Sequence, residues 1–205
     1  MKIITISREF GSGGRELGKR LADILGYDYY DREIIEMISK EKDLDSSFVE
    51  KSLESGAWRA APLTFRHSFT GVSQVQAIQT NLLLEQKKVI EGIAKLNRNC
   101  VIVGRNADIL LAKENPFNLF VCADAESKIK RCVERAESRI SEKEILKHMK
   151  NIDKNRAKTR EILSGGKWGE RENYHLIVNT SGWNIKELTP AVAEFAQYRF
   201  EKEVK

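Results

Sequence analysis

The strongest constraint on the fold is the junction between residues 3 and 22, where an apolar segment leads into glycines and then into an amphipathic pattern. The segment is IITISREFGSGGRELGKRLA, with Gly11, Gly13 and Gly14 at the turn. Glycine permits a left-handed backbone and lets an anion approach the amides closely. A helix that begins there adds the positive end of its dipole. The junction therefore predicts a strand, a phosphate-binding turn and a helix, against the alternative of a purely structural turn.

The turn departs from the common phosphate-binding pattern G-x-x-x-x-G-K-[ST] at its two functional side chains. Gly14 and Arg15 stand where that pattern has its lysine and its hydroxyl residue. The positive charge of the absent lysine could be supplied by Arg15 in the helix or by Arg8 at the strand end, and the sequence leaves both possibilities open. Ser12 is the nearest hydroxyl inside the loop for a metal or phosphate contact. The candidate residues for binding a phosphate donor are Arg8, Gly11, Ser12, Gly13, Gly14, Arg15 and Glu16.

Five short apolar segments, rich in β-branched and aromatic residues, are predicted as strands buried on both faces. They are Lys2 to Ser7, Tyr27 to Tyr30, Cys100 to Val103, Asn118 to Ala123 and Leu176 to Asn179. The helices predicted around them are Gly14 to Leu25, Arg32 to Lys40, Val75 to Leu96, Ala125 to Ala136, Ser141 to Leu163 and Ile185 to Phe200. This alternation is typical of a three-layer α/β/α fold with a parallel sheet and right-handed crossovers.

A chain of 205 residues suits one domain, 1–205, with a core of 1–42 and 71–205. Between residues 43 and 70 the helical pattern loosens, and Arg59, Arg66 and His67 lie among Trp58 and Phe65. We expect a helical insertion laid over a ligand site, with a partly ordered surface excursion as the alternative. A second loosened patch, Ser164 to Gly169, follows the long helix.

Composition narrows the classes of function. Charged residues make up 32% and hydrophobic residues 41%, and no apolar run approaches the roughly 20 residues of a membrane helix. The first residues pass directly into a strand pattern without a signal peptide, and the three cysteines lack metal-ligand spacing, so we expect a cytoplasmic location and reduced thiols. The net charge of +5 comes from basic residues interleaved with 30 acidic ones, which favours a phosphate substrate over nucleic acid.

Two further strand ends carry charged candidates. Asp31 follows a predicted strand, where it either caps the next helix or faces the crevice beyond the carboxyl ends of the strands. Arg105 follows Gly104 directly after another buried strand. An unpaired arginine is costly to bury, so it either pairs with a carboxylate such as Asp108 or binds a ligand phosphate. The sequence favours the ligand, because this strand end opens onto the same crevice as the glycine loop.

The long basic helix carries the last group of candidates. Arg156 and Arg160 are four residues apart and share one helix face. Their mutual repulsion calls for anions opposite, which Asp153, Glu161 or a bound triphosphate can supply. The sequence therefore favours a pair of arginines that together bind a phosphate, and a solvent-exposed helix face is the alternative.

Taken in order, these elements resemble the cytidylate kinase-like family of nucleoside monophosphate kinases. The firmest matches are SREFGSGGRE from Ser7, YDRE from Tyr30, VGRNAD from Val103 and DKNR from Asp153. The resemblance implies a five-stranded parallel sheet, a monophosphate-binding insertion and an arginine-bearing lid at about residues 150–170. It also implies ATP and Mg²⁺ as cofactors and a small nucleotide, CMP or dCMP, as the acceptor of the γ-phosphoryl group. No residues of the chain are predicted as a metal site, and the sequence is silent on oligomeric state.

Carried over by position, the resemblance places Gly11 to Gly14 on the donor phosphates and assigns the acceptor to Asp31, Arg105, Asp108 and Asp153. Arg15, Arg156 and Arg160 are the predicted catalytic residues, because phosphoryl transfer needs mainly positioning and charge neutralisation. Besides the missing loop lysine and hydroxyl, Met149 stands where the family has an arginine. Two alternatives to the nucleotide kinase therefore stay open: a non-catalytic nucleotide-binding regulator, and a kinase for another small metabolite.

Overall fold

The computed structural model describes residues 1–54, 69–136 and 141–202. Its centre is a five-stranded sheet in the order β2-β3-β1-β4-β5, and all neighbouring strands are parallel. The strands are β1 (Ile3–Arg8), β2 (Asp28–Tyr30), β3 (Cys100–Val103), β4 (Phe117–Cys122) and β5 (Leu176–Asn179). The parallel α/β architecture that the sequence predicts is confirmed.

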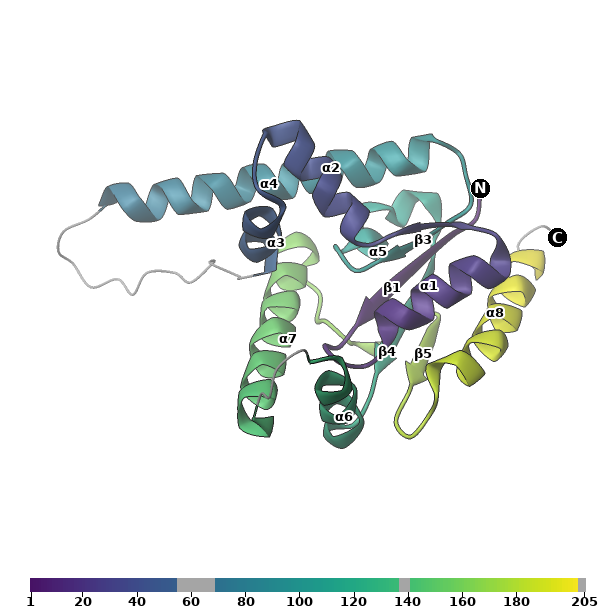
Figure 1. The fold of residues 1–205 in the computed structure, drawn as a ribbon. Coiled ribbons are helices and arrows are strands. Elements are labelled where there is room, and N and C mark those ends of the chain that lie inside the picture. Colours follow the sequence, from purple (N-terminus) through teal and green to yellow (C-terminus); the bar gives the residue numbers. More distant parts are fainter. Residues whose placement is uncertain (55–68, 137–140, 203–205) are drawn as a thin grey trace.

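Helices surround this sheet (Figure 1). They are α1 (Gly14–Leu25), α2 (Arg32–Lys42), α3 (Ser46–Glu54), α4 (Phe69–Lys95), α5 (Ala107–Leu110), α6 (Ala125–Arg135), α7 (Glu142–Ser164) and α8 (Ile185–Lys202), with short 3-10 turns at Ala112–Glu114 and Arg171–Asn173. Among the described residues, no helix is both long and apolar enough to cross a membrane.

The core forms because β1 is apolar on both faces and all six of its residues are buried. Successive side chains of a strand point to opposite faces. Ile4 and Ile6 therefore pack with α1 and α8, through residues such as Leu17 and Val192. Ile3 packs on the opposite face in a cluster with α2, α3 and α4. Figure 1 shows these two helical layers on either side of the sheet.

The register of the sheet gathers the candidate residues at one edge. Ile6 of β1 pairs with Val103 of β3, so Arg8 and Arg105 each lie two residues further toward the carboxyl edge. Tyr30 of β2 pairs with Ile102, which brings Asp31 to the same edge. Helix α6 and the middle of α7 lie near the end of β1 (Figure 1), where Asp153 accepts the Phe10 amide. Segments that are distant in the sequence thus meet where ligands bind in open α/β sheets.

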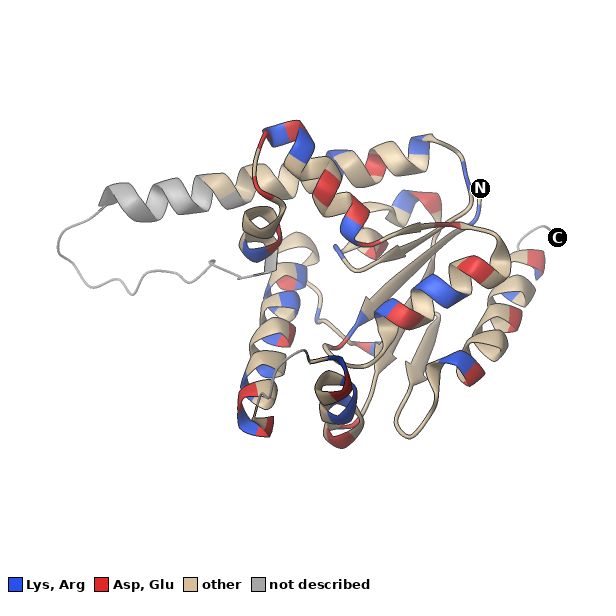
Figure 2. Ribbon diagram, in the orientation of Figure 1, with Lys and Arg blue, Asp and Glu red and all other residues tan. Residues whose placement is uncertain are grey.

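The predicted helix from Gly14 to Leu25 has the observed bounds, while the other predicted helices differ at one or both ends. The largest difference is α4, which begins at Phe69 and not at Val75. The predicted insertion at 43–70 is helical over α3, and its candidates Trp58, Arg59, Phe65, Arg66 and His67 lie outside the described residues. In Figure 2, basic and acidic residues alternate along the helices of the described chain and the strands carry few charges.

Candidate functional site

The glycine loop between β1 and α1 has the backbone geometry that its sequence predicts. Gly11 and Gly13 have φ of 77° and 83°, in the left-handed region that favours glycine. Gly13 is the N-cap of α1. The first amides of the helix lack an intrahelical acceptor, and Gly13 has no side chain to cap them. These amides therefore offer hydrogen bonds to an anion at the start of the helix.

The loop is tied to its surroundings through Ser12, which is fully buried. The Ser12 hydroxyl donates to the Glu9 carbonyl at 2.8 Å, and the Thr180 hydroxyl donates to the Ser12 carbonyl at 2.7 Å. The Glu9 carboxylate in turn pairs with Lys128 of α6 at 2.8 Å. Ser12 thus turns its hydroxyl toward the loop's own backbone, and its predicted role as a metal or phosphate ligand stays a prediction.

A cavity of about 940 Å³, here called the loop cavity, opens over the glycine loop. Gly11, Gly13 and Gly14 of the loop line it, together with residues of α6 and α7. Its cationic lining residues are Arg8, Arg15, Arg32, Arg131, Arg135 and Arg156. Phe10 and His148 add an aromatic wall, with their ring centroids 5.0 Å apart. The loop cavity therefore combines open amides, excess positive charge and two aromatic rings packed edge to face.

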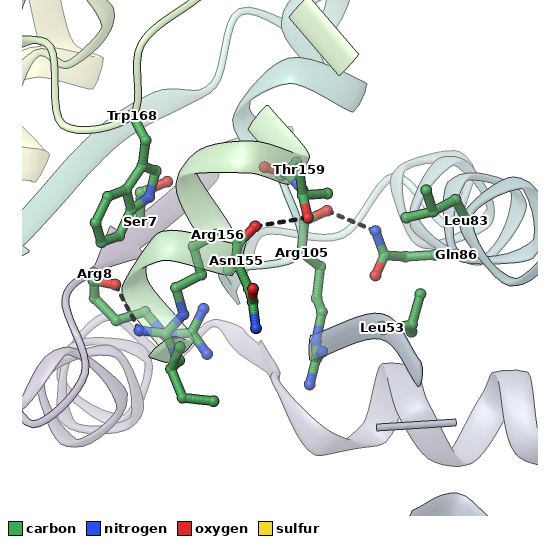
Figure 3. A pocket seen from close by; sticks show the side chains of 13 residues that line it. Ser7, Arg8, Leu53, Leu83, Gln86, Arg105, Asn155, Arg156, Thr159 and Trp168 are labelled. Atoms are coloured by element: carbon green, nitrogen blue, oxygen red, sulfur yellow. Dashed lines mark hydrogen bonds between the residues drawn. The ribbon is translucent and has the colours of Figure 1, made fainter. Parts of the chain in front are cut away.

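A smaller cavity of about 60 Å³, here called the strand-end cavity, lies at the ends of β1 and β3 (Figure 3). The guanidinium groups of Arg8, Arg105 and Arg156 point into it, and among its described lining residues none is acidic. Leu83 and Trp168 supply apolar walls. Three guanidinium groups beside one another repel unless an anion lies between them. The strand-end cavity therefore suits an anionic group attached to an apolar body.

Arg8 occupies the centre of this arrangement. It is 8% exposed, and its Nη2 lies 3.6 Å from Asp31 Oδ1. Burial lowers the pKa of Arg8 to about 9, with further lowering by Arg156, Arg105 and Arg15 and a partial opposing effect of Asp31. The positive charge of the Arg8 guanidinium is thus only partly balanced by its surroundings, and an anionic ligand would balance the remainder.

Asp31 lies at the N-cap position of α2 but does not act as a helix cap. Its buried carboxylate pairs with Arg15 of α1 and approaches Arg8, and among the described residues it caps no amide of α2. The structure thus gives no support to the capping role; Asp31 lines neither the loop cavity nor the strand-end cavity and reaches them only through Arg8 and Arg15, so its predicted substrate contact stays a prediction. Arg15 is consequently tied to a carboxylate, and its side chain is 44% exposed.

Arg105 lies in a segment of unusual backbone. Gly104, Arg105 and Asn106 all have left-handed φ values, 73°, 58° and 53°. Such residues cost about 1 to 3 kcal/mol each when they are not glycine, and they cluster at functional sites. Gln86 of α4 holds the turn by donating to the Arg105 carbonyl at 3.0 Å. The turn aims the Arg105 guanidinium into the strand-end cavity (Figure 3).

Helix α7 is attached directly to the end of β1. The Asp153 carboxylate accepts the Phe10 amide at 2.8 Å and pairs with Arg156 at 3.1 Å. Arg156 Nη1 also donates to the Arg8 carbonyl at 2.9 Å. Burial raises the pKa of Asp153, against the opposing effects of the Phe10 amide and Arg156. Arg156 thereby reaches the strand ends from a segment almost 150 residues away, and the lid role that the resemblance implies for it stays a prediction.

Arg160 lies apart from Arg156 although the two share α7. Its guanidinium pairs with buried Asp108 and lies 5.4 Å from the Tyr174 ring centroid. Neither Arg160 nor Asp108 lines the loop cavity or the strand-end cavity. The catalytic role of Arg160 and the substrate contact of Asp108 stay predictions, and the geometry favours a structural role for this buried pair.

Several lining residues escaped the sequence interpretation. Gln86 and Leu83 come from the long helix α4, and Asn155 comes from α7. The sequence around such a residue contains no motif that reveals it, because its role depends on how its helix packs against a strand end far away in the sequence. Trp168 lies in the loosened patch at Ser164 to Gly169, which the sequence singled out as a segment without assigning it a residue role.

The described residues include no group of three or more His, Cys, Asp or Glu side chains that would hold a metal ion. Mg²⁺ in nucleotide sites is commonly bound by one or two carboxylates together with substrate phosphates. Asp31 is a candidate ligand, because its buried Oδ1 lies 3.6 Å from Arg8 Nη2, which belongs to a residue lining both cavities, and has no hydrogen-bond donor within the described chain. A magnesium ion here would depend mainly on the phosphates that it accompanies.

The parallel sheet with a glycine loop between its first strand and first helix defines a kinase-like P-loop fold. The sequence matches the cytidylate kinase-like family over residues 3–182, and the chain belongs to that family. A search of curated proteins found no match.

Three solved structures illustrate the likeness in fold. An uncharacterized protein from Eubacterium ventriosum is 24% identical, with a TM-score of 0.70 and coverage of 96% of this chain and 99% of that one. Shikimate kinase from Bacteroides thetaiotaomicron is 15% identical, with a TM-score of 0.56 and coverage of 96% and 98%. Shikimate kinase from Aquifex aeolicus is 17% identical, with a TM-score of 0.53 and coverage of 97% and 96%.

Proposed function

We propose that this protein transfers the γ-phosphoryl group of ATP to a nucleoside monophosphate, with CMP or dCMP as the acceptor. The observation that carries the proposal is the adjacency of two cationic cavities. The loop cavity and the strand-end cavity share Arg8 and Arg156 in their linings. A donor and an acceptor bound in the two cavities would meet at these arginines.

The loop cavity suits the donor, because the amides at the start of α1 can bind its phosphates. The strand-end cavity, at about 60 Å³, suits the phosphate of the acceptor, which would face Arg105, while the ribose and base would extend beyond the cavity. When bound with the nucleotide, Mg²⁺ would neutralise charge on the donor phosphates, with Asp31 as the candidate ligand from this chain. Arg156 would hold the transferring group from the α7 side.

The test is a coupled assay of ADP release with purified protein, Mg²⁺, ATP and each common nucleoside monophosphate in turn. Turnover that depends on one pyrimidine monophosphate is the expected result. Turnover only with acceptors that are not nucleotides, such as hydroxylated carboxylic acids, would replace the nucleotide acceptor with another metabolite. ATP hydrolysis without any acceptor serves as the background rate.

A second candidate, a nucleotide-binding regulator without turnover, is favoured by one specific observation. Gly14 and Arg15 stand in place of the lysine and the hydroxyl residue of the common phosphate-binding motif. Calorimetry separates the two candidates, since tight binding of Mg²⁺-ATP without ADP release under any acceptor would support the regulator.

A further inference from the structure

The Arg8 side chain runs between two glycines that come from different elements. A Cβ placed on Gly14 would lie 2.6 Å from Arg8 Cβ and 3.0 Å from Arg8 Cγ. A Cβ placed on Gly104 would lie 1.6 Å from Arg8 Nη1. Real Cβ atoms do not approach other atoms so closely. The stem of Arg8 therefore needs glycine at 14, and its guanidinium needs glycine at 104.

This packing explains the departure from the common phosphate-binding motif. Position 14 is where the motif carries its lysine, and Arg8 fills the space that the first carbon of that lysine would need. A lysine at 14 and Arg8 in its observed position are therefore mutually exclusive. Because the closest contact is to Arg8 Cβ, any side chain at position 8 excludes a lysine at 14; the arginine at this position brings a guanidinium group to both cavities instead.

The location of Arg8 also suits it to take over the charge of the absent lysine. Only Arg8 and Arg156, among the described residues, line both the loop cavity and the strand-end cavity. Arg15, the other candidate to replace the lysine charge, lines the loop cavity but not the strand-end cavity, and it pairs with Asp31. Of the two arginines between which the sequence left the choice open, the geometry favours Arg8.

We infer that Arg8 replaces the loop lysine and binds the terminal phosphate of a nucleoside triphosphate at the junction of the two cavities; this inference rests on the proposed function. A guanidinium presents a planar fork of donors, so Arg8 binds two phosphate oxygens where an ammonium group acts as a point charge. The pKa of Arg8, lowered to about 9 by burial and neighbouring arginines, supports an anion site, because a phosphate would relieve the uncompensated charge.

The first test compares Arg8→Met with Arg98→Met by titration calorimetry, using Mg²⁺-ATP and inorganic tripolyphosphate as probes. Arg98 lies just before β3, at the amino ends of the strands, and forms an exposed ion pair with Asp28. Its substitution therefore removes one guanidinium group far from the cavities and serves as the matched control. A charge-assisted hydrogen bond implies a loss of about 10- to 100-fold in affinity for Arg8→Met. Arg98→Met is expected to bind both probes as the wild type does.

Because Arg8 is buried, the second test leaves it in place. Gly104→Ala puts a methyl group where Nη1 lies, and the obstructed atom is the end of a flexible side chain, so the guanidinium is displaced; the φ of 73° adds backbone strain, which circular dichroism and unfolding of the variant measure separately. The expected loss of affinity is again about 10-fold or more. In an Arg8→Met background, Gly104→Ala is expected to cause no further loss. An equal loss in both backgrounds would show that the effect is backbone strain at Gly104 and would overturn the inference.

The remaining outcomes separate this inference from the proposed function. Wild-type affinity in Arg8→Met, or a larger loss in Arg15→Met, would overturn the inference and leave the proposed kinase standing. Binding that depends on Arg8, without turnover under any acceptor, would support the inference and refute the kinase. Wild-type protein that binds neither ATP nor tripolyphosphate would refute both.

Discussion

Gly14→Ala is the simplest perturbation of the packing around Arg8. The added methyl would lie 2.6 Å from Arg8 Cβ and 3.3 Å from Val121 Cβ. Both carbons are fixed to the backbone of buried strands, so no rotamer change moves them away. Overpacking of this kind costs about 1 to 3 kcal/mol. Gly92→Ala provides the control, because Gly92 lies inside α4 with nothing within 4 Å of the added carbon.

In Gly92→Ala the methyl group meets no obstacle, and the higher helix propensity of alanine stabilises the protein by about 1 kcal/mol. We expect the free energies of unfolding of the two variants to differ by about 2 kcal/mol or more, with Gly14→Ala the less stable. For a chain of this size, 1 kcal/mol corresponds to about 2–4 °C in Tm, so the midpoints should differ by about 4–8 °C. Thermal and urea unfolding followed by circular dichroism measure both quantities. Equal stabilisation by the two substitutions would refute the exclusion of a side chain at position 14.

Four further outcomes follow from the site. Arg156→Ala should lower kcat more than it weakens ATP binding, and an unchanged kcat would remove Arg156 from the catalytic residues. Arg105→Ala should raise KM for the acceptor without changing ATP affinity, whereas a change in Tm alone would indicate a structural role. Asp108→Ala leaves Arg160 buried without its carboxylate, so unfolding experiments should show a loss of about 3–5 kcal/mol. Burial raises the pKa of the Cys100 thiol to about 11, so between pH 9 and 11 the unfolded chain releases a proton that the folded chain retains. The free energy of unfolding should therefore fall as the pH rises through this range, and Cys100→Ala should flatten that decline.

Local patterns were sufficient for much of the fold. The helix from Gly14 to Leu25 follows from glycines before it, an apolar face within it and Gly26 after it, and its bounds are as predicted. The strands were recognisable because parallel strands buried on both faces are short continuous apolar runs. Helix α4 was harder to delimit, since its first turn contains Thr70 and Gly71, which are weak helix formers.

The partners of the charged residues were not predictable in the same way. The sequence left Asp31 either as a helix cap or as a residue facing the crevice, and it did not predict that its carboxylate pairs with Arg15 and approaches Arg8. Asp108 was a possible partner for nearby Arg105 but pairs with Arg160, 52 residues away. Electrostatic pairing depends on distance in space and on burial, and sequence separation reports neither.

The amino-acid sequence by itself determined the layered α/β class, the glycine loop and the set of basic residues around it, because these depend on backbone freedom and on hydrophobic periodicity within a few residues. The tertiary structure decided which arginine takes the central place. Only the pairing of β1 with β3 and the docking of α1 bring Gly104 and Gly14 to either side of Arg8. Close packing then leaves room for the Arg8 side chain between these two glycines, and no local pattern encodes the distance between two segments 90 residues apart.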